Sequence, residues 1–368
     1  MASGDVAART CVAVCCGKKP DPVPARMRSV PAGNSPARPN GGFPVVSRSA
    51  ASILVLLTAL SAGSGVASAQ TYPARPIRIV VGYSPGGPTD IFARLVGQKL
   101  AETWGTSVVV ENRPGAATNI AAEAVARAAP DGYTLFTPTL ANAINMTLYG
   151  KPGYDIVTDF AHVSNMVMAP DVGMVHPSVP ARNVRELFAL AKARPGELRN
   201  GSSGVGSPSH LEVEMLKTLA GVQMTHVPYK GAAPVLTDLV AGHIECYFGG
   251  FASALPFIQA KRVRPIAITG LKRVAIVPDV PTLDEQGFKG FELVSWFGIS
   301  APAGTPREIV ARLNAGVVRA VGSPEMRERL GPMGATVVGD TPEQFTEFVR
   351  REVAKMAVAV RQSGAKPE

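Results

Sequence analysis

From Ile77 onward the sequence alternates short β-rich apolar runs with segments whose apolar residues recur at helical spacing. Turns rich in proline and glycine separate the segments. This βαβαβ order predicts an α/β fold in which a largely parallel sheet carries helices on its faces. The expected elements are a strand over 77–81, a helix over 89–104, a strand over 107–110, a helix over 118–128 and a strand over 133–137.

A second series follows an apolar stretch at 163–175. Two crossover segments, near 169–175 and 291–300, predict two lobes joined by a hinge, with a ligand cleft between them. Residues 70–170 and 296–368 would form lobe 1, and residues 171–295 would form lobe 2. The expected helices of this series cover 183–193, 207–220, 232–241, 252–260, 306–321, 324–330 and 342–363, and the strands cover 198–201, 223–227, 244–248 and 264–269.

Residues 1–69 have the pattern of a secretory presequence and stay outside the predicted fold. Arg48 precedes an apolar run at about 50–60, and an A-x-A cleavage site ends at Ala69. We expect cleavage after Ala69 and Sec-type export to the periplasm, with Met27 as an alternative to Met1 as the start. A membrane anchor is the weaker alternative, because glycines interrupt the run before the roughly 20 apolar residues that a span needs.

The basic character of the chain comes largely from this presequence. The whole chain has 37 basic and 28 acidic residues, and residues 1–69 hold seven of the basic and two of the acidic ones, which leaves a net charge of +4. A nucleic-acid partner is therefore not expected. Of the four cysteines, only Cys246 lies outside the presequence, so the exported chain cannot form an intramolecular disulfide.

Two loops rich in glycine and serine each lead into a predicted helix, at 83–90 and at 201–210. Glycines let the backbone approach a ligand closely, and a helix start presents unpaired N–H groups with a partial positive charge. Such loops, one in each lobe, could grip a carboxylate from two sides. For the first loop a plain helix cap is the alternative, in which Thr89 or Asp90 serves only the backbone.

Neither loop completes an enzyme motif. A nucleophile elbow G-x-S-x-G is absent, because Gly204 follows Ser203 directly, and neither loop ends as a Walker A motif does. The histidines show no pairing at metal-ligand spacing. We expect no catalytic residue, no metal and no cofactor, and an enzyme remains the least favoured alternative.

Several motifs closely resemble those of the Bug-type receptors of tripartite tricarboxylate transporters, and the resemblance runs from Tyr72 to the C-terminus. It implies a periplasmic two-lobed Venus-flytrap fold of type II, in which each lobe is a mixed, mostly parallel sheet flanked by helices, and no catalysis. The matching motifs include Ser84-Pro85-Gly86-Gly87-x-Thr89-Asp90, Glu111-Asn112-Arg113-Pro114-Gly115-Ala116, Pro130-Asp131-Gly132-Tyr133, His226-Val227-Pro228-Tyr229-Lys230-Gly231 and Ser295-Trp296-Phe297-Gly298.

The resemblance also implies which residues bind the ligand, since family members hold a carboxylate through backbone amides and ordered waters. Asn142 stands where many members carry His. Trp296 and Phe297 lie on the second crossover, where core packing and cleft lining are both open. The expected ligand-binding residues are Tyr83, Ser84, Gly86, Gly87, Thr89, Asp90, Thr137, Thr139, Asn142, Ser202, Ser203, Gly206, Ser207, His210, Gly249 and Gly250.

One departure from the family pattern bears on the ligand. Many members have Asp where this chain has Gly249, and in members that bind amino acids this acid can pair with the ligand's ammonium group. Such a charge-assisted hydrogen bond is worth roughly 1.5–3 kcal/mol. We therefore predict a ligand without a cationic amine, with Gly249 and Gly250 leaving room for bulk.

The resemblance favours a receptor that delivers a mono- or dicarboxylate to a tripartite tricarboxylate-type permease in the membrane. A sensing role, in which the liganded protein docks on the periplasmic domain of a sensor kinase, remains open because both roles use the same cleft. We expect a monomer, since a clamp must move freely.

Overall fold

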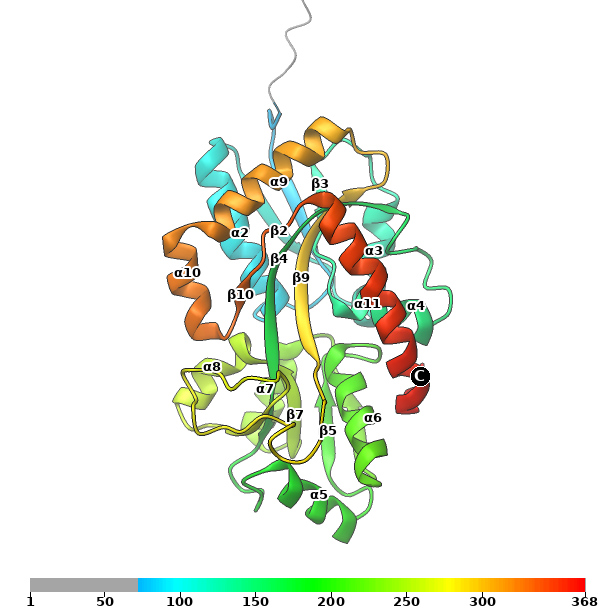
Figure 1. Ribbon diagram of the computed structural model, residues 1–368, viewed down its shortest axis with the longest axis vertical. Helices are drawn as coiled ribbons and strands as arrows, with labels where there is room; N and C mark the ends of the chain where they lie inside the picture. Colours follow the sequence, from blue (N-terminus) through cyan, green and yellow to red (C-terminus); the bar gives the residue numbers. More distant parts are fainter. Residues whose placement is uncertain (1–71, 368) are drawn as a thin grey trace, which may run out of the picture. The chain divides into compact units, whose positions relative to one another are not determined.

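The computed structural model describes residues 72–367, and the predicted signal peptide, its cleavage site and the alternative start at Met27 lie outside them. A ten-stranded mixed sheet runs through the described part of the chain (Figure 1). Its main path has the strand order β2-β1-β3-β9-β4-β7-β5-β6, and β8 and β10 both pair with β4.

In the first half of the sheet β1 lies between β2 and β3, parallel to both. Ile79 of β1 stands opposite Val110 and Leu135, so the centre of this half is apolar. The elements are β1 (Ile77–Val81), α2 (Pro88–Trp104), β2 (Val108–Asn112), η1 (Ala116–Thr118), α3 (Asn119–Ala126), β3 (Thr134–Phe136) and α4 (Leu140–Leu148).

Two long antiparallel strands, β4 (Phe160–Val175) and β9 (Val294–Pro302), run side by side through the middle of Figure 1. From Phe160 to Pro170, β4 pairs with β9; from Asp171 to Val175 it pairs with β7, and from Val172 also with β8. The partner change falls within the predicted crossover segment 169–175. Asp171 is therefore the residue at which β4 passes from one half of the sheet to the other.

The second half repeats the layout of the first, with β5 between β6 and β7 and parallel to both. The two predicted series of strands and helices are confirmed, with ends shifted by one to a few residues. The elements are α5 (Val184–Ala193), β5 (Arg199–Ser202), α6 (Pro208–Ala220), β6 (Thr225–Pro228), α7 (Ala232–Ala241), β7 (Cys246–Gly250), α8 (Phe251–Gln259) and β8 (Arg264–Ile268).

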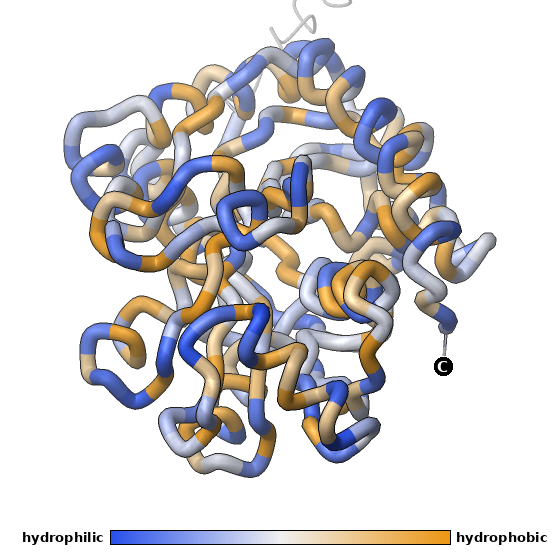
Figure 2. Tube along the Cα trace, turned by 60° about the horizontal axis from the view of Figure 1, so that its bottom comes forward, coloured by the Kyte–Doolittle hydropathy of each residue, from blue (hydrophilic) through white to orange (hydrophobic). Residues whose placement is uncertain are grey.

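After β9 the chain returns to the first half, and its last helix reaches the second. The helix α11 buries Phe345, Val349, Met356 and Val360, which recur at helical spacing. Figure 2 shows the matching alternation of hydrophobic and hydrophilic residues along this helix. No helix within residues 72–367 has the length and apolarity needed to cross a membrane. The remaining elements are α9 (Arg307–Gly322), α10 (Pro324–Leu330), η2 (Gly331–Met333), β10 (Thr336–Val337) and α11 (Pro342–Ser363).

Candidate functional site

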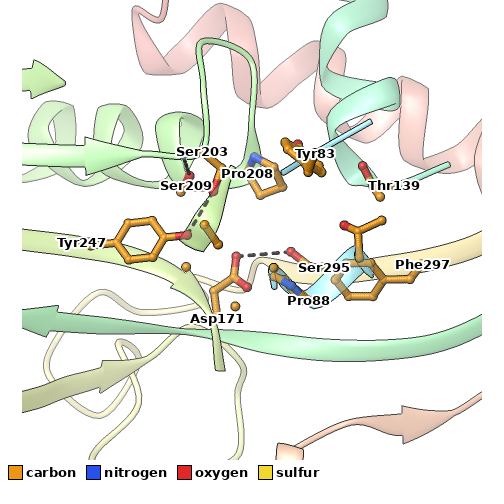
Figure 3. A pocket seen from close by; sticks show the side chains of 15 residues that line it. Tyr83, Pro88, Thr139, Asp171, Ser203, Pro208, Ser209, Tyr247, Ser295 and Phe297 are labelled. Carbon is orange, nitrogen blue, oxygen red and sulfur yellow. Dashed lines mark hydrogen bonds between the residues drawn. The ribbon is translucent and has the colours of Figure 1, made fainter. Parts of the chain in front are cut away.

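A small cavity lies where helix N-termini from both halves of the sheet converge (Figure 3). The starts of α2, α6 and α7 contribute to its wall, together with the residues just before α4 and α8. The cavity has a volume of about 40 Å³. The lining residues are Tyr83, Gly87, Pro88, Thr89, Thr139, Asp171, Ser203, Pro208, Ser209, Ala232, Tyr247, Gly249, Gly250, Ser295 and Phe297.

The wall favours an anion through its backbone. Unpaired N–H groups at a helix start carry a partial positive charge, and here several such starts point at one space. Among the described residues that line the cavity, none is basic. An anionic group bound here would therefore be held by amides and hydroxyls.

Asp90 shapes the first loop from behind the cavity. Its carboxylate accepts hydrogen bonds from the Gly86 N–H at 3.0 Å and from Asn112 Nδ2 at 2.8 Å, and it pairs with Arg94 at 2.9 Å. Burial opposes ionisation of Asp90, but the hydrogen bonds from Arg94, Gly86 and Asn112 hold its pKa below the usual range. Asp90 thus braces the first loop without capping α2, whose N-cap residue is Gly87, and Thr89 lines the cavity.

Tyr83 brings a buried hydroxyl to the cavity wall. Burial raises its pKa, and the Thr139 hydroxyl lies beside it. Within residues 72–367 no hydrogen bond of ordinary geometry reaches Tyr83 Oη. A buried hydroxyl in this situation can bond a ligand without losing an existing partner.

The second loop brings Ser203 and Ser209 to the cavity, and its other hydroxyls hold its shape. Ser203 Oγ lies 3.0 Å from Tyr247 Oη, and the Ser203 N–H donates to Ser209 Oγ at 2.9 Å. Behind them, Ser207 caps α6, and Ser202 Oγ lies 2.6 Å from Nε2 of His226.

The pair Gly249 and Gly250 leaves no room for ligand bulk, so that expectation is wrong. A Cβ on Gly249 would lie 2.1 Å from the Tyr247 ring, and one on Gly250 would lie 2.6 Å from Cγ of Pro88. The protein's own side chains already fill the space above these glycines.

The cavity contains an acid that the sequence had not indicated. Asp171 of β4 pairs with Gly250 of β7, and its carboxyl enters the cavity (Figure 3). The Ser295 hydroxyl donates to Asp171 Oδ2 at 3.2 Å. The expectation of an amine-free ligand assumed a cavity without an acid, because Gly249 had replaced one. Because the carboxyl group of Asp171 lines the cavity, that assumption does not hold.

Glu212 of α6 lies against Asp171 and is fully buried. Burial raises the pKa of both carboxyl groups, and the charge of Asp171 raises that of Glu212 further. No N–H or hydroxyl group in the described part of the chain donates to either Glu212 oxygen. Two buried carboxyl groups in contact oppose each other's ionisation, so the pair titrates together.

The expected ligand-binding residues divide into two groups. Tyr83, Gly87, Thr89, Thr139, Ser203, Gly249 and Gly250 line the cavity. Outside the lining are Ser84, Gly86, Asp90, Thr137, Asn142, Ser202, Gly206, Ser207 and His210.

Residues of the second group brace the site. Asn142 donates to Thr118 Oγ1 at 2.8 Å and to Tyr154 Oη at 2.9 Å. His210 stacks on His226 with ring centroids 4.4 Å apart. They keep loops and helix starts in place without facing the cavity themselves.

Sequence reasoning missed much of the wall that comes from other segments. Phe297 lines the cavity, while its neighbour Trp296 is buried against Phe345 and Phe348, so the two open roles fall to different residues. The predicted site residues left out Pro88, Pro208 and Ser209, although these lie in the two loops. No local composition marks the other missed residues, which are Asp171, Ala232, Tyr247 and Ser295.

Comparisons with known proteins agree with this architecture. Residues 92–364 match the family described as "Tripartite tricarboxylate transporter family receptor". Protein BugT of Bordetella pertussis is 34% identical over 319 residues, which cover 85% of this chain and 98% of that protein. A protein of the tcbD-tcbE intergenic region of Pseudomonas sp. strain P51 is 36% identical over 77% of this chain and 85% of its own length.

Solved structures give the same result. Rpa4515 of R. palustris, solved with adipate, is 38% identical with a TM-score of 0.78, over 81% of this chain and 100% of that one. MatC of Rhodopseudomonas palustris, solved with bound malate, is 33% identical with a TM-score of 0.76, over 78% and 100%. The α/β fold, a mixed sheet flanked by helices, is that of periplasmic binding proteins. This chain belongs to the tripartite tricarboxylate transporter receptor family, whose members are periplasmic solute-binding proteins.

Proposed function

We propose that this receptor captures a small carboxylate in the cavity and delivers it to a tripartite tricarboxylate-type permease. One observation carries the proposal: helix starts from both halves of the sheet surround one cavity whose lining has no basic side chain. Backbone amides at helix starts are suited to an anionic oxygen. The adipate and malate in two solved relatives support the ligand class.

The proposal includes two lobes, residues 70–170 with 296–368 and residues 171–295, that close on the ligand. Hydrogen bonds between the two proposed lobes support it: the Ser84 N–H donates to the Lys230 carbonyl at 3.0 Å, and Tyr149 Oη donates to the Val205 carbonyl at 3.1 Å. A ligand that touches both lobes stabilises the closed form by its differential affinity. In this proposal the protein is exported by its signal peptide, acts as a monomer and catalyses no reaction.

The test begins with protein purified mildly from a periplasmic extract. Mass spectrometry of the small molecules released on denaturation should find a carboxylate. A carboxylate at 100 times its Kd should stabilise the protein by about 2.7 kcal/mol, which a thermal-shift screen detects as a higher Tm.

The variant Gly87→Val places bulk in the first loop and should lose this response, whereas Gly322→Ala, outside the cavity, should keep it. The proposed function would be contradicted if the protein released no carboxylate on denaturation and no carboxylate in the screen raised its Tm.

A further inference from the structure

The wall of the cavity holds an acid although the helix starts around it favour an anion. Among the described residues that line the cavity, Asp171 is the sole carboxylic acid and none is basic (Figure 3). In a volume of about 40 Å³, an anionic oxygen lies close to this carboxyl group whichever part of the wall it contacts. A carboxylate ligand would therefore share a small space with an acid.

The surroundings of Asp171 supply hydrogen bonds but no full positive charge. The Ser295 hydroxyl donates to Asp171 Oδ2 at 3.2 Å, and the Asp171 N–H donates to Thr269 Oγ1 at 2.9 Å. Behind Asp171 lies the carboxyl group of Glu212, on α6. Glu212 is 0% exposed and Asp171 is 3% exposed, so bulk water screens neither acid. The pair is poorly suited to carry two negative charges.

The other titratable groups near the pair do not change this balance. Tyr83 and Tyr247 interact with Asp171, and both are buried acids that cannot supply a positive charge. Behind the first loop, Asp90 and Arg94 of α2 pair with each other at 2.9 Å. The partial positive charge of the helix starts suits one anion. A ligand carboxylate and an ionised Asp171 would compete for it.

An anion that enters the cavity opposes ionisation of Asp171 further. Burial already raises the pKa of Asp171 to about 7, so this acid is partly ionised near neutral pH in the ligand-free protein. A second negative charge close by raises the pKa of an acid still more. In its neutral form the carboxyl group can donate a hydrogen bond to the ligand, and such a bond to a charged oxygen is stronger than one between neutral groups.

We propose that this receptor captures its carboxylate together with a proton, which the Asp171–Glu212 pair takes up, so that Asp171 faces the bound ligand as a neutral hydrogen-bond donor. The inference rests on the proposed function, since it needs an anionic ligand in the cavity. The proton comes from the solvent, stays on the acid pair while the ligand is bound and returns to the solvent on release. Capture therefore weakens as the pH rises, although the ligand itself stays ionised.

The test is isothermal titration calorimetry of the unmodified protein with acetate, malate and adipate between pH 6.5 and pH 8.5, where these probes are ionised. The affinity for a probe that binds should fall at least about tenfold over this range, because the ionised acid must regain a proton before capture. Titrations at pH 7.5 in phosphate and in Tris, which differ in ionisation enthalpy, should show uptake of up to one proton per ligand.

Three variants locate the proton. In Asp171→Asn the affinity should change less than twofold over the same pH range, with no proton uptake. In Glu212→Gln, outside the cavity lining, the new amide can donate to Asp171 and stabilise its charge, so the loss of affinity should begin at a lower pH. Asp279→Asn, at an exposed acid outside the cavity, is the matched control and should follow the unmodified protein.

The outcomes separate this inference from the proposed function. A carboxylate that binds with constant affinity and without proton uptake, or more tightly as the pH rises, would refute the inference and leave the proposed function intact. So would a pH dependence that persists unchanged in Asp171→Asn. If Asp171→Asn does not fold, the unmodified protein and Glu212→Gln decide the question. A protein that binds none of the probes at any pH would refute both.

Discussion

Asp171 on β4 lies directly opposite Gly250 on β7, and this pairing puts a carboxyl group beside a residue that has no side chain. Residues opposite each other in a ladder share one face of the sheet. Gly249, the residue before Gly250, faces the other side of β7, where the ring of Tyr247 occupies the space above that glycine.

The variant Gly249→Ala should destabilise the protein because its new methyl group would lie 2.1 Å from the Tyr247 ring. Overpacking of a filled site costs about 1–3 kcal/mol, which urea unfolding can measure. The control Gly322→Ala adds a methyl group to a position with no neighbour within 4 Å and should cost nothing measurable. Equal stability of the two variants would mean that the Tyr247 ring moves aside freely.

The variant Asp171→Asn should gain stability relative to the unmodified protein as the pH rises from 5 to 8. Burial raises the pKa of Asp171 to about 7, so its folded pKa exceeds its unfolded one. The stability that this acid contributes is present in full below its unfolded pKa and is lost as the pH rises through the folded pKa. Relative to pH 5, the variant should be at least about 1 kcal/mol more stable than the unmodified protein at pH 8.

Neighbouring titratable groups decide how the Asp171→Asn result is measured. Glu212, Tyr83 and Tyr247 all interact with Asp171, so the pH profile must be compared between variants rather than read from one protein. Urea unfolding of both proteins at pH 5 and pH 8 gives that comparison. If the difference in the free energy of unfolding between the two proteins stays constant with pH, the folded pKa of Asp171 is ordinary.

The buried ring of His162 should weaken the fold in acid. Burial lowers its pKa to about 4, and Nδ1 lies 2.8 Å from Ser300 Oγ. Below pH 6.5 the unfolded chain takes up a proton that the folded chain excludes, so stability falls as the pH drops from 6.5 towards 4. The loss between pH 7 and pH 5 should be about 2 kcal/mol. Unfolding of His162→Gln at the two pH values should show a change smaller by that amount.

The features that sequence reasoning found are those written into local composition. Glycine and serine before a helical pattern mark both loops, and the loops indeed bring Gly87 and Ser203 to the cavity. The helix α4 was not predicted from the sequence. It has only nine residues, fewer than the roughly 11–18 over which a helical period stands out.

The contact between Asp171 and Glu212 could not be predicted from the sequence, for a different reason. Asp171 and Glu212 are far apart in the sequence, and only the register of β4 against β7 and the position of α6 bring them together. A slip of one residue would turn Asp171 to the other face of the sheet. Register therefore decides the chemistry of this cavity, and composition does not reveal register.

The hydrogen bond from Tyr149 Oη to the Val205 carbonyl offers a test of lobe closure, because it joins the residue after α4 to the second loop. If this bond forms only when the lobes close, Tyr149→Phe should weaken ligand binding without lowering the stability of the ligand-free protein. One such bond is worth about 0.5–1.5 kcal/mol, so the affinity should fall about two- to tenfold.

The matched control for Tyr149→Phe is Tyr133→Phe, whose hydroxyl accepts from the Ala74 N–H within the first half of the sheet. Calorimetry should find its affinity unchanged. The loss in Tyr149→Phe should appear as faster ligand release, because a closed clamp holds the ligand by the contacts that must break on opening. Unchanged affinity together with lower stability of the ligand-free variant would mean that the bond is equally present without ligand, and that closure does not depend on it.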